Sequence, residues 1–254
     1  MSLVLDRRGP VLVVRLDRPE ARNALTPELM SGVGAAVLDA ESDVDIRVLV
    51  LTGTGDRAFC AGMDLRAFAS GADFDSGDAG TAAYHRLARG EVSVPVVGAA
   101  NGAAIGGGLE LLLGCDVVVA SEQASFGFPE VKRGLFPAGG GTAIGTRIPV
   151  AVALEMVLTG DPVGAARAYQ LGLVNSVVPP GEVLDAALAY AGRIAANAPL
   201  GLAAAKNLVR LGVTDAARAA TRLAEWQATV FASDDAKEGA AAFMAKRPPV
   251  WTGR

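Results

Sequence analysis

Residues 101–113 read NGAAIGGGLELLL, a glycine-rich turn that leads directly into an apolar segment. The consecutive glycines at positions 106–108 leave backbone amides uncovered by side chains at the expected start of a helix. Such N–H groups, reinforced by the helix dipole, suit an anion or a developing oxyanion. A tight crossing of a strand by a helix also needs small residues, so the glycines alone leave both interpretations open.

Two carboxylates accompany this turn. Glu110 lies two residues past the last of these glycines, in the first turn of an otherwise apolar helix, so it is not on a solvated face. It is either a buried charge paired with an arginine or an acid or base of tuned pKa. Glu130, at the end of the apolar segment FGFPE, offers a second carboxylate, and the glycine cluster PAGGGT follows at 137–142.

The surrounding pattern predicts an α/β core, because apolar β-type segments alternate with helical ones. Thr26 followed by Pro27 is typical of a helix start, and this helix is expected to reach about Ala40. Residues 71–80, rich in glycine and aspartate, predict a mobile loop. The predicted strands are 3–6 and 11–16, which form a hairpin, and 47–52, 94–100 and 115–120, which are apolar enough to be buried.

From about residue 198 the strand signals vanish. Three alanine- and leucine-rich segments with helical spacing follow, at 199–212, 214–232 and 234–246. We therefore expect a core over residues 1–197 and a helical C-terminal module over residues 198–254.

Other sites are disfavoured by what the sequence lacks. The turn at 53–58 matches G-x-G-x-x-A after a strand, but a dinucleotide site needs a helix at once, and another glycine turn follows instead. The single histidine, His85, cannot build a zinc site of several histidines, and no G-x-S-x-G elbow accompanies it. Cys60 and Cys115 are expected to be buried free thiols. No metal site is predicted.

Composition limits the partners. The 254 residues carry a net charge of −4 with scattered basic residues, which argues against nucleic acid. No apolar run approaches the roughly 20 residues that cross a bilayer. The start of the chain does not resemble a secretory signal, so we expect a cytoplasmic protein.

Taken together, these motifs resemble the crotonase (enoyl-CoA hydratase/isomerase) superfamily. The similar segments run in order along the chain, at 16–25, 59–65, 101–110, 126–142, 155–160, 171–174 and 243–247. The resemblance implies an α/β fold built as a spiral of ββα units with a C-terminal helical trimerisation module. It also implies a homo-trimer or a dimer of trimers that binds an acyl-CoA thioester.

The resemblance further implies which residues act. The backbone amides of Met63 and Gly107 match the pair that stabilises the enolate oxygen of the thioester. Glu110 and Glu130 match the two hydratase glutamates, the first activating water for attack at C3 and the second exchanging a proton with C2. The implied activity is reversible hydration of a 2-enoyl-CoA, with coenzyme A as part of the substrate and no separate cofactor.

Further positions are implied for substrate binding. Arg22 and Arg66 match residues that meet the coenzyme's phosphates, and Phe243 and Lys246 match residues that reach a neighbouring subunit's site. Ala138 stands where many hydratases have glycine, and Lys132 and Arg133 bring positive charge that could pair with Glu130. The turn residues that complete the expected substrate contacts are Ala61, Asp64, Leu65 and Gly106.

Two alternatives stay open at this point. One is a sister activity on the same scaffold, such as an isomerase, hydrolase or decarboxylase. The other is a catalytically silent acyl-CoA-binding protein, although two glutamates favour chemistry over binding alone.

Overall fold

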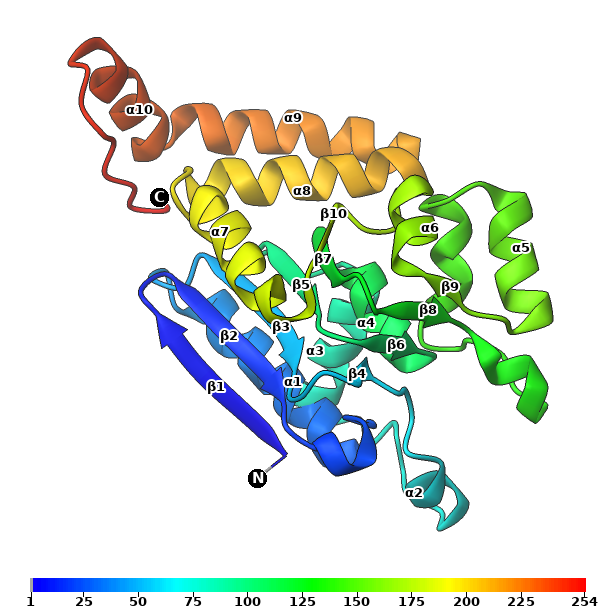
Figure 1. Cartoon of the computed structure of the whole chain (residues 1–254). Helices are drawn as coiled ribbons and strands as arrows, with labels where there is room; N and C mark the ends of the chain where they lie inside the picture. Colours follow the sequence, from blue (N-terminus) through cyan, green and yellow to red (C-terminus); the bar gives the residue numbers. More distant parts are fainter. Residues whose placement is uncertain (1) are drawn as a thin grey trace.

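From β3 to β8, successive strands alternate between two sheets in the computed structural model, which describes residues 2–254 (Figure 1). The larger sheet has the order β1-β2-β3-β5-β7-β10 and the smaller one β4-β6-β8-β9. The pairs β3–β4, β5–β6 and β7–β8 each send one strand to each sheet, and helices follow, so the chain turns as a spiral of ββα units. The strands are β1 (Leu3–Arg8), β2 (Val11–Leu16), β3 (Val48–Gly53), β4 (Ala58–Cys60), β5 (Val96–Ala100), β6 (Ala103–Ile105), β7 (Val117–Ser121), β8 (Ser125–Gly127), β9 (Val163–Gly164) and β10 (Ser176–Val178).

Helices fill the intervals and form the C-terminal part of the chain. The α-helices are α1 (Pro27–Ser42), α2 (Leu65–Ala69), α3 (Ala79–Ala88), α4 (Gly107–Gly114), α5 (Val150–Thr159), α6 (Ala165–Gln170), α7 (Val183–Ala195), α8 (Pro199–Thr214), α9 (Ala216–Ala232) and α10 (Asp234–Met244). The short 3-10 helices are η1 (Pro19–Ala21), η2 (Pro129–Arg133), η3 (Gly141–Thr146) and η4 (Pro180–Glu182). In Figure 1, α8 and α9 run side by side and α10 projects from one corner.

The large sheet is buried on both faces. Its inner strands are parallel, and every residue of β3 is buried, which explains the continuous apolar run in the sequence. On one face the valines of β2, β3 and β5 pack against α7, which lies across these strands in Figure 1. The contact stripe of α7 repeats every fourth residue, at Val183, Ala187, Ala191 and Ala195. The main core lies on the opposite face, where α1 packs.

Most of the predicted elements are confirmed. The hairpin forms as β1 and β2, and α1 begins where Thr26 accepts a hydrogen bond from the Leu29 amide ahead of Pro27. The last three segments are helical, as predicted. The turn at 53–58 leads into β4 rather than a helix, which agrees with rejecting a dinucleotide site.

Two predictions need correction. The loop at 71–80 ends early, because Asp78 accepts a hydrogen bond from the Thr81 amide and so caps α3 from its first residue, Ala79. The predicted strands also did not include β4, β6, β8, β9 and β10. These strands have only two or three residues each, too few to show an alternating pattern.

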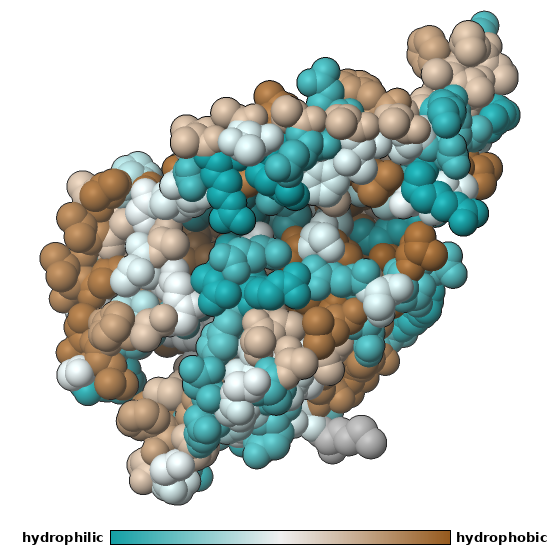
Figure 2. All heavy atoms as spheres, turned by 180° about the vertical axis from the view of Figure 1, so that it is seen from behind, coloured by the Kyte–Doolittle hydropathy of each residue, from teal (hydrophilic) through white to brown (hydrophobic). Residues whose placement is uncertain are grey.

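The surface carries apolar stretches on two helical faces. On α5, Val150, Leu154 and Leu158 are all exposed and lie four residues apart. This helix forms the right edge of the molecule in Figure 1, and Figure 2, seen from behind, shows apolar surface along the corresponding left edge. The second stretch is a groove between α8 and α9 that includes Leu223 and Phe231. Of the helices within residues 2–254, none has the length and apolar character that would let it span a bilayer.

Two glycines of α1, Gly32 and Gly34, test how closely α1 packs against α3. A Cβ on Gly34 would lie 1.7 Å from the carbonyl oxygen of Gly80 at the start of α3, whereas one on Gly32 would meet only the end of the Leu3 side chain at 3.3 Å. We expect Gly34→Ala to lower the free energy of unfolding by about 2 kcal/mol or more through overpacking. Gly32→Ala should leave it unchanged or raise it by up to about 1 kcal/mol through helix propensity. Urea unfolding followed by circular dichroism measures both, and equal effects would contradict the close approach of α1 and α3.

Candidate active site

Two glycine turns meet at the ends of neighbouring strands of the small sheet. β4 and β6 are parallel, so the turns after them, at 61–64 and 106–107, come together. Gly62 has φ 84°, and a Cβ there would lie 2.7 Å from the carbonyl oxygen of Ile105 and 3.2 Å from the amide nitrogen of Gly107. Only glycine permits both this backbone conformation and this contact.

The amides of Met63 and Gly107 are both free of protein acceptors. Across residues 2–254, neither donates a hydrogen bond within the chain. The flanking groups of the first turn are used, because the Leu25 amide donates to the carbonyl of Gly62 and the Asp64 amide donates to the carbonyl of Leu25, each at 2.8 Å. The second amide belongs to the first residue of α4, where the helix leaves it without an internal partner.

Two asparagines that the sequence reading passed over hold these turns in place. Asn23 is fully buried with φ 54°, and its side-chain amide donates to the carbonyls of Thr54 and Ala58 at 3.1 and 2.9 Å. Asn101 accepts from the amide of Gly53 at 3.0 Å and donates to the carbonyl of Gly55 at 2.7 Å. The asparagines thereby tie the 18–25 segment and the end of β5 to the ends of β3 and β4.

Glu110 is only 8% exposed and lies in the first turn of α4. Its Oε1 accepts a hydrogen bond from the amide of Gly141 at 2.9 Å. Burial raises the pKa of this carboxyl, and the amides of Gly141 and Gly139 act in the opposite direction. A Cβ on Gly139 would lie 2.4 Å from Oε2 of Glu110, so the glycine cluster at 139–141 forms the wall beside this carboxylate.

Glu130 lies in η2 and borders the same turn from the other side. A Cβ on Gly106 would lie 2.8 Å from its Oε1, while one on the next residue, Gly107, would lie 3.7 Å from Oε2 of Glu110. The Oε2 atom of Glu130 is buried without a hydrogen-bond partner. Burial raises the pKa of Glu130, and the negative charge of Glu110 raises it further, while its own backbone amide and the charge of Arg133 act against these effects. The protonation state of Glu110 therefore affects the pKa of Glu130, and the two carboxyl groups titrate as a coupled pair.

Neither glutamate forms an ion pair with any residue in the described range 2–254. The suggested pairing of Lys132 with Glu130 is wrong, because Lys132 extends into solvent and binds Asp161 at 2.5 Å. Arg133 donates to the carbonyl of Pro129 within its own helix and reaches Glu130 only through its charge. A buried carboxyl group and a partly buried one without a paired cation are costly, which is typical of a functional site rather than of a structural ion pair.

The expected substrate-binding residues fall into two groups. Arg22 and Arg66 are exposed on the segments that flank the first turn, and their side chains bind no other side chain within residues 2–254. Asp64 is engaged instead, because it pairs with Arg18 at 3.1 Å and caps α2 through the amides of Arg66 and Ala67.

The remaining predicted contacts lie at different places. Ala61 and Leu65 flank the first turn, and Ala138 is exposed next to the glycine that contacts Glu110. Phe243 and Lys246 lie at the end of α10, which Figure 1 shows far from α4 and β6. Phe243 is 86% exposed, so within one chain these two residues do not reach the glutamates.

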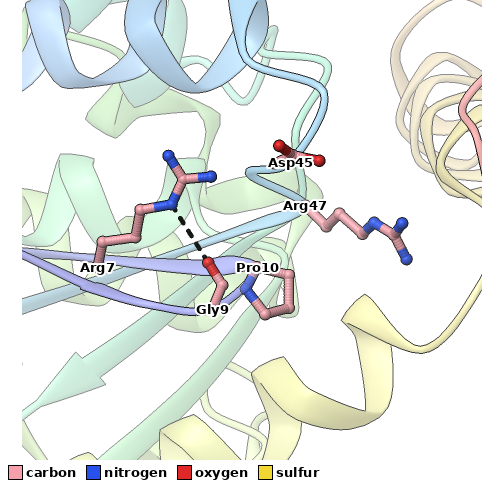
Figure 3. A pocket seen from close by; sticks show the side chains of 5 residues that line it. All are labelled: Arg7, Gly9, Pro10, Asp45 and Arg47. Atoms are coloured by element: carbon pink, nitrogen blue, oxygen red, sulfur yellow. Dashed lines mark hydrogen bonds between the residues drawn. The ribbon is translucent and has the colours of Figure 1, made fainter.

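Other features do not form a second centre. His85 stacks edge-on against Tyr84, and both cysteines are buried free thiols. Residues 2–254 hold no group of three or more potential metal-ligating side chains. An open hollow at the β1–β2 turn contains Arg7 and Arg47 (Figure 3), but their guanidinium groups are occupied by Asp43 and by the carbonyl of Trp251.

Comparison with known proteins gives a consistent result. The family described as "Enoyl-CoA hydratase/isomerase" matches residues 6–254. A curated relative from Salmonella paratyphi A, named carnitinyl-CoA dehydratase, is 40% identical over 100% of this chain and 99% of its own length. The solved structure of an enoyl-CoA hydratase from Mycobacterium tuberculosis aligns with a TM-score of 0.89 at 40% identity, covering 100% of this chain and 99% of that one. A carnitinyl-CoA hydratase from Mycobacterium avium aligns with a TM-score of 0.77 at 42% identity over the same shares of the two chains. The ordered motifs, the spiral of ββα units and these matches along the full length show that this chain belongs to the enoyl-CoA hydratase/isomerase family.

Proposed function

We propose that this protein is an enoyl-CoA hydratase, which adds water reversibly to the 2,3 double bond of a 2-enoyl-CoA thioester. The observation that carries the proposal is the juxtaposition of two carboxyl groups without an ion-pair partner, one buried and one partly buried, with two unoccupied backbone amides where two glycine turns meet. Coenzyme A enters as part of the substrate, and the reaction uses no separate cofactor.

In this proposal the amides of Met63 and Gly107 receive the thioester oxygen. Addition of water at C3 sends an electron pair through C2 to this oxygen, so negative charge develops there in the transition state. Each preorganised amide is worth about 3 kcal/mol of stabilisation at such a site. Because both N–H groups lack protein acceptors, no internal hydrogen bond has to break before they bind the oxygen.

The two glutamates take opposite roles. Glu110 is the base, because two backbone amides counteract the effect of its burial and favour its charged form. It removes a proton from the water whose oxygen bonds to C3. Glu130 is the acid, because burial and the charge of Glu110 favour its protonated form and raise its pKa against the opposing effects of its own backbone amide and of Arg133. It donates its proton to C2, so hydration ends with the proton on Glu110, and dehydration follows the same steps in reverse.

The names of the relatives support water chemistry over the sister activities. One relative is called a dehydratase and another a hydratase, and both names describe water leaving or joining an acyl-CoA. An isomerase or a decarboxylase adds no water to its substrate, so neither would need two carboxyl groups on a shared water, and a hydrolase is disfavoured by the names of the relatives alone. A silent binding protein would have no need of two costly buried acids.

The proposal extends to the coenzyme and to assembly. Arg22 and Arg66 supply exposed charge for the phosphates of coenzyme A.

We further propose a homo-trimer or a dimer of trimers, in which a division at residues 197 and 198 separates the core from the assembly helices. In that assembly Phe243 and Lys246 would reach the neighbouring subunit's site, and the apolar faces of α5 and α9 would be covered. The enzyme would act in the cytoplasm.

Replacing either carboxylate tests the mechanism. We expect Glu110→Gln and Glu130→Gln each to lower the rate of crotonyl-CoA hydration at least about a hundredfold, the usual scale for a general acid or base. The loss of absorbance of the conjugated enoyl thioester measures the rate. Glu122→Gln, at an exposed glutamate in the loop after β7, is the matched control and should keep full activity. Wild-type rates in both active-site variants would remove the mechanism, and stable binding without turnover in the wild type would favour a silent binding protein.

The coupled carboxyl groups predict a bell-shaped dependence of kcat/KM on pH. The rate falls at low pH when Glu110 takes up a proton, and it falls at high pH when Glu130 loses its proton. Both limbs should lie above the ordinary range of a glutamate, because burial raises both pKa values. In Glu110→Gln the neighbouring charge is gone, so the pKa of Glu130 should fall, as carbon-13 NMR of labelled glutamate measures. A pH profile without an alkaline limb would contradict the assignment of Glu130 as the acid.

Charged substitutions on the apolar faces test assembly. We expect Leu154→Glu on α5 and Phe231→Glu on α9 each to reduce the oligomeric mass measured by light scattering. Val44→Glu, at an isolated exposed valine, should leave the mass unchanged. A wild-type chain that is monomeric at micromolar concentration would overturn the proposed trimer.

A further inference from the structure

The segment η3 is tied to α4 at both of its ends. At the start, the amide of Gly141 donates to Oε1 of Glu110 at 2.9 Å. Just past the end, Nη1 of Arg147 donates to the carbonyl of Leu113, also at 2.9 Å. The two acceptors, Glu110 and Leu113, lie three residues apart on the same helix, a rise of about 4.5 Å. The 3-10 helix is therefore held alongside α4 by one bond to the proposed base and one bond to the backbone.

Of these two bonds, the one to Glu110 affects the pKa and the orientation of the proposed base. Apart from the counteracting amides of Gly141 and Gly139, burial governs the pKa of this carboxyl. Withdrawing the amide of Gly141 would leave the charged form less stabilised and would free the carboxylate to rotate. Any residue that keeps this amide in place thus helps to set both the protonation and the orientation of the base.

Arg147 is built into a cluster at the far end of α4. The helix ends with carbonyls that have no internal donor, and arginines supply the missing bonds. Arg147 donates to the carbonyl of Leu113, and Arg210 from α8 donates to those of Gly114 and Cys115 at 2.8 and 3.0 Å. Arg210 also pairs with Asp116 at 2.8 Å.

The groups that face Arg147 come from several elements. Burial lowers its pKa, as does the positive charge of Arg210, while Cys115 and Asp116 act against this. A guanidinium stays protonated under such conditions. A lysine would keep a charge but would lack the planar, forked geometry and is more easily deprotonated when buried.

We infer that Arg147 is a positioning residue for Glu110, because its bond to Leu113 anchors η3 and thereby keeps the amide of Gly141 on the carboxylate. This role deepens the proposed function, on which its kinetic part rests. Arg147 touches neither the reacting atoms nor the glutamate itself. It acts through the six residues of η3.

The test combines Arg147→Gln with Arg147→Lys. In Arg147→Gln we expect the pKa of Glu110 to rise, followed by carbon-13 NMR of labelled glutamate with Glu110→Gln as the assignment standard. We expect kcat for crotonyl-CoA hydration to fall at least about tenfold, since small misplacements of a reacting group cost one to two orders of magnitude. KM should change less than twofold, because no substrate contact is removed. Arg147→Lys should recover part of both changes.

Arg47→Gln is the matched control. Arg47 is likewise an arginine that ties two elements together through carbonyls, those of Ala195 and Trp251, and it lies at the β1–β2 end of the large sheet (Figure 3). Its loss should lower the stability of the fold while leaving the titration of Glu110 unchanged. A second control is Arg147→Gln in the Glu110→Gln background, where it should cost no further loss in kcat.

The outcomes separate the inference from the proposed function. A wild-type enzyme that hydrates no enoyl-CoA refutes the proposed function, but the titration of Glu110 still decides the role of Arg147. An unchanged pKa and kcat in folded Arg147→Gln would overturn the inference. If that variant does not fold, Arg147→Lys decides, and wild-type titration together with wild-type kcat in Arg147→Lys would overturn it as well.

Discussion

The contact between the turns at Gly62 and Gly107 is the constraint on which the rest of the site depends. No side chain fits between them, since even a Cβ on Gly62 would strike the carbonyl of Ile105. The next residue along, Gly108, is equally close, because a Cβ there would lie 2.2 Å from the carbonyl oxygen of Cys60. This approach sets the start of α4 directly against β4. Two segments more than forty residues apart thereby meet with the free amides of Met63 and Gly107 in adjacent turns, and Glu110 follows in the first turn of the helix.

The energetic cost of this arrangement is the desolvation of the two carboxyl groups. Glu110 and Glu130 are held near each other with no basic side chain to neutralise them within residues 2–254, so burial raises both pKa values. The charged form of Glu110 is stabilised by the amides of the 139–141 cluster, and that of Glu130 by its own backbone amide and the charge of Arg133. In the proposed mechanism, the difference between the two environments assigns one residue the role of base and the other that of acid, in the manner of other paired carboxylates.

The surrounding elements serve to keep this geometry. Asn23 and Asn101 replace missing strand pairing at the ends of β3 and β4, and the left-handed φ angles of Arg22 and Asn23 persist because these bonds hold them. At the other end of α4, arginines from η3 and α8 bind its free carbonyls. The C-terminal helices thus contact the scaffold of the site as well as presenting apolar faces to solvent. The division of the chain at residues 197 and 198 and the trimer both stay predictions.

The sequence alone determined the α/β class, the long central strands, the capped helix α1, the C-terminal helices and the pairing of a triple glycine with a buried glutamate. These features have local signatures, because apolar period, capping residues and glycine runs act over a few neighbouring positions. Only the tertiary structure decided the rest. It placed the three-residue strands in the small sheet and formed the asparagine hydrogen bonds, which span 31 to 48 residues. It also paired Lys132 with Asp161 and brought Arg147 to the carbonyl of Leu113. The asparagine and Arg147 bonds join a side chain to a distant backbone atom that any residue could supply, and Lys132 pairs with a side chain 29 residues away, so no local sequence pattern records them. The shared placement of the two carboxyl groups belongs to the same class, since nothing in the nineteen positions between them indicates that the chain brings them back to the same turn.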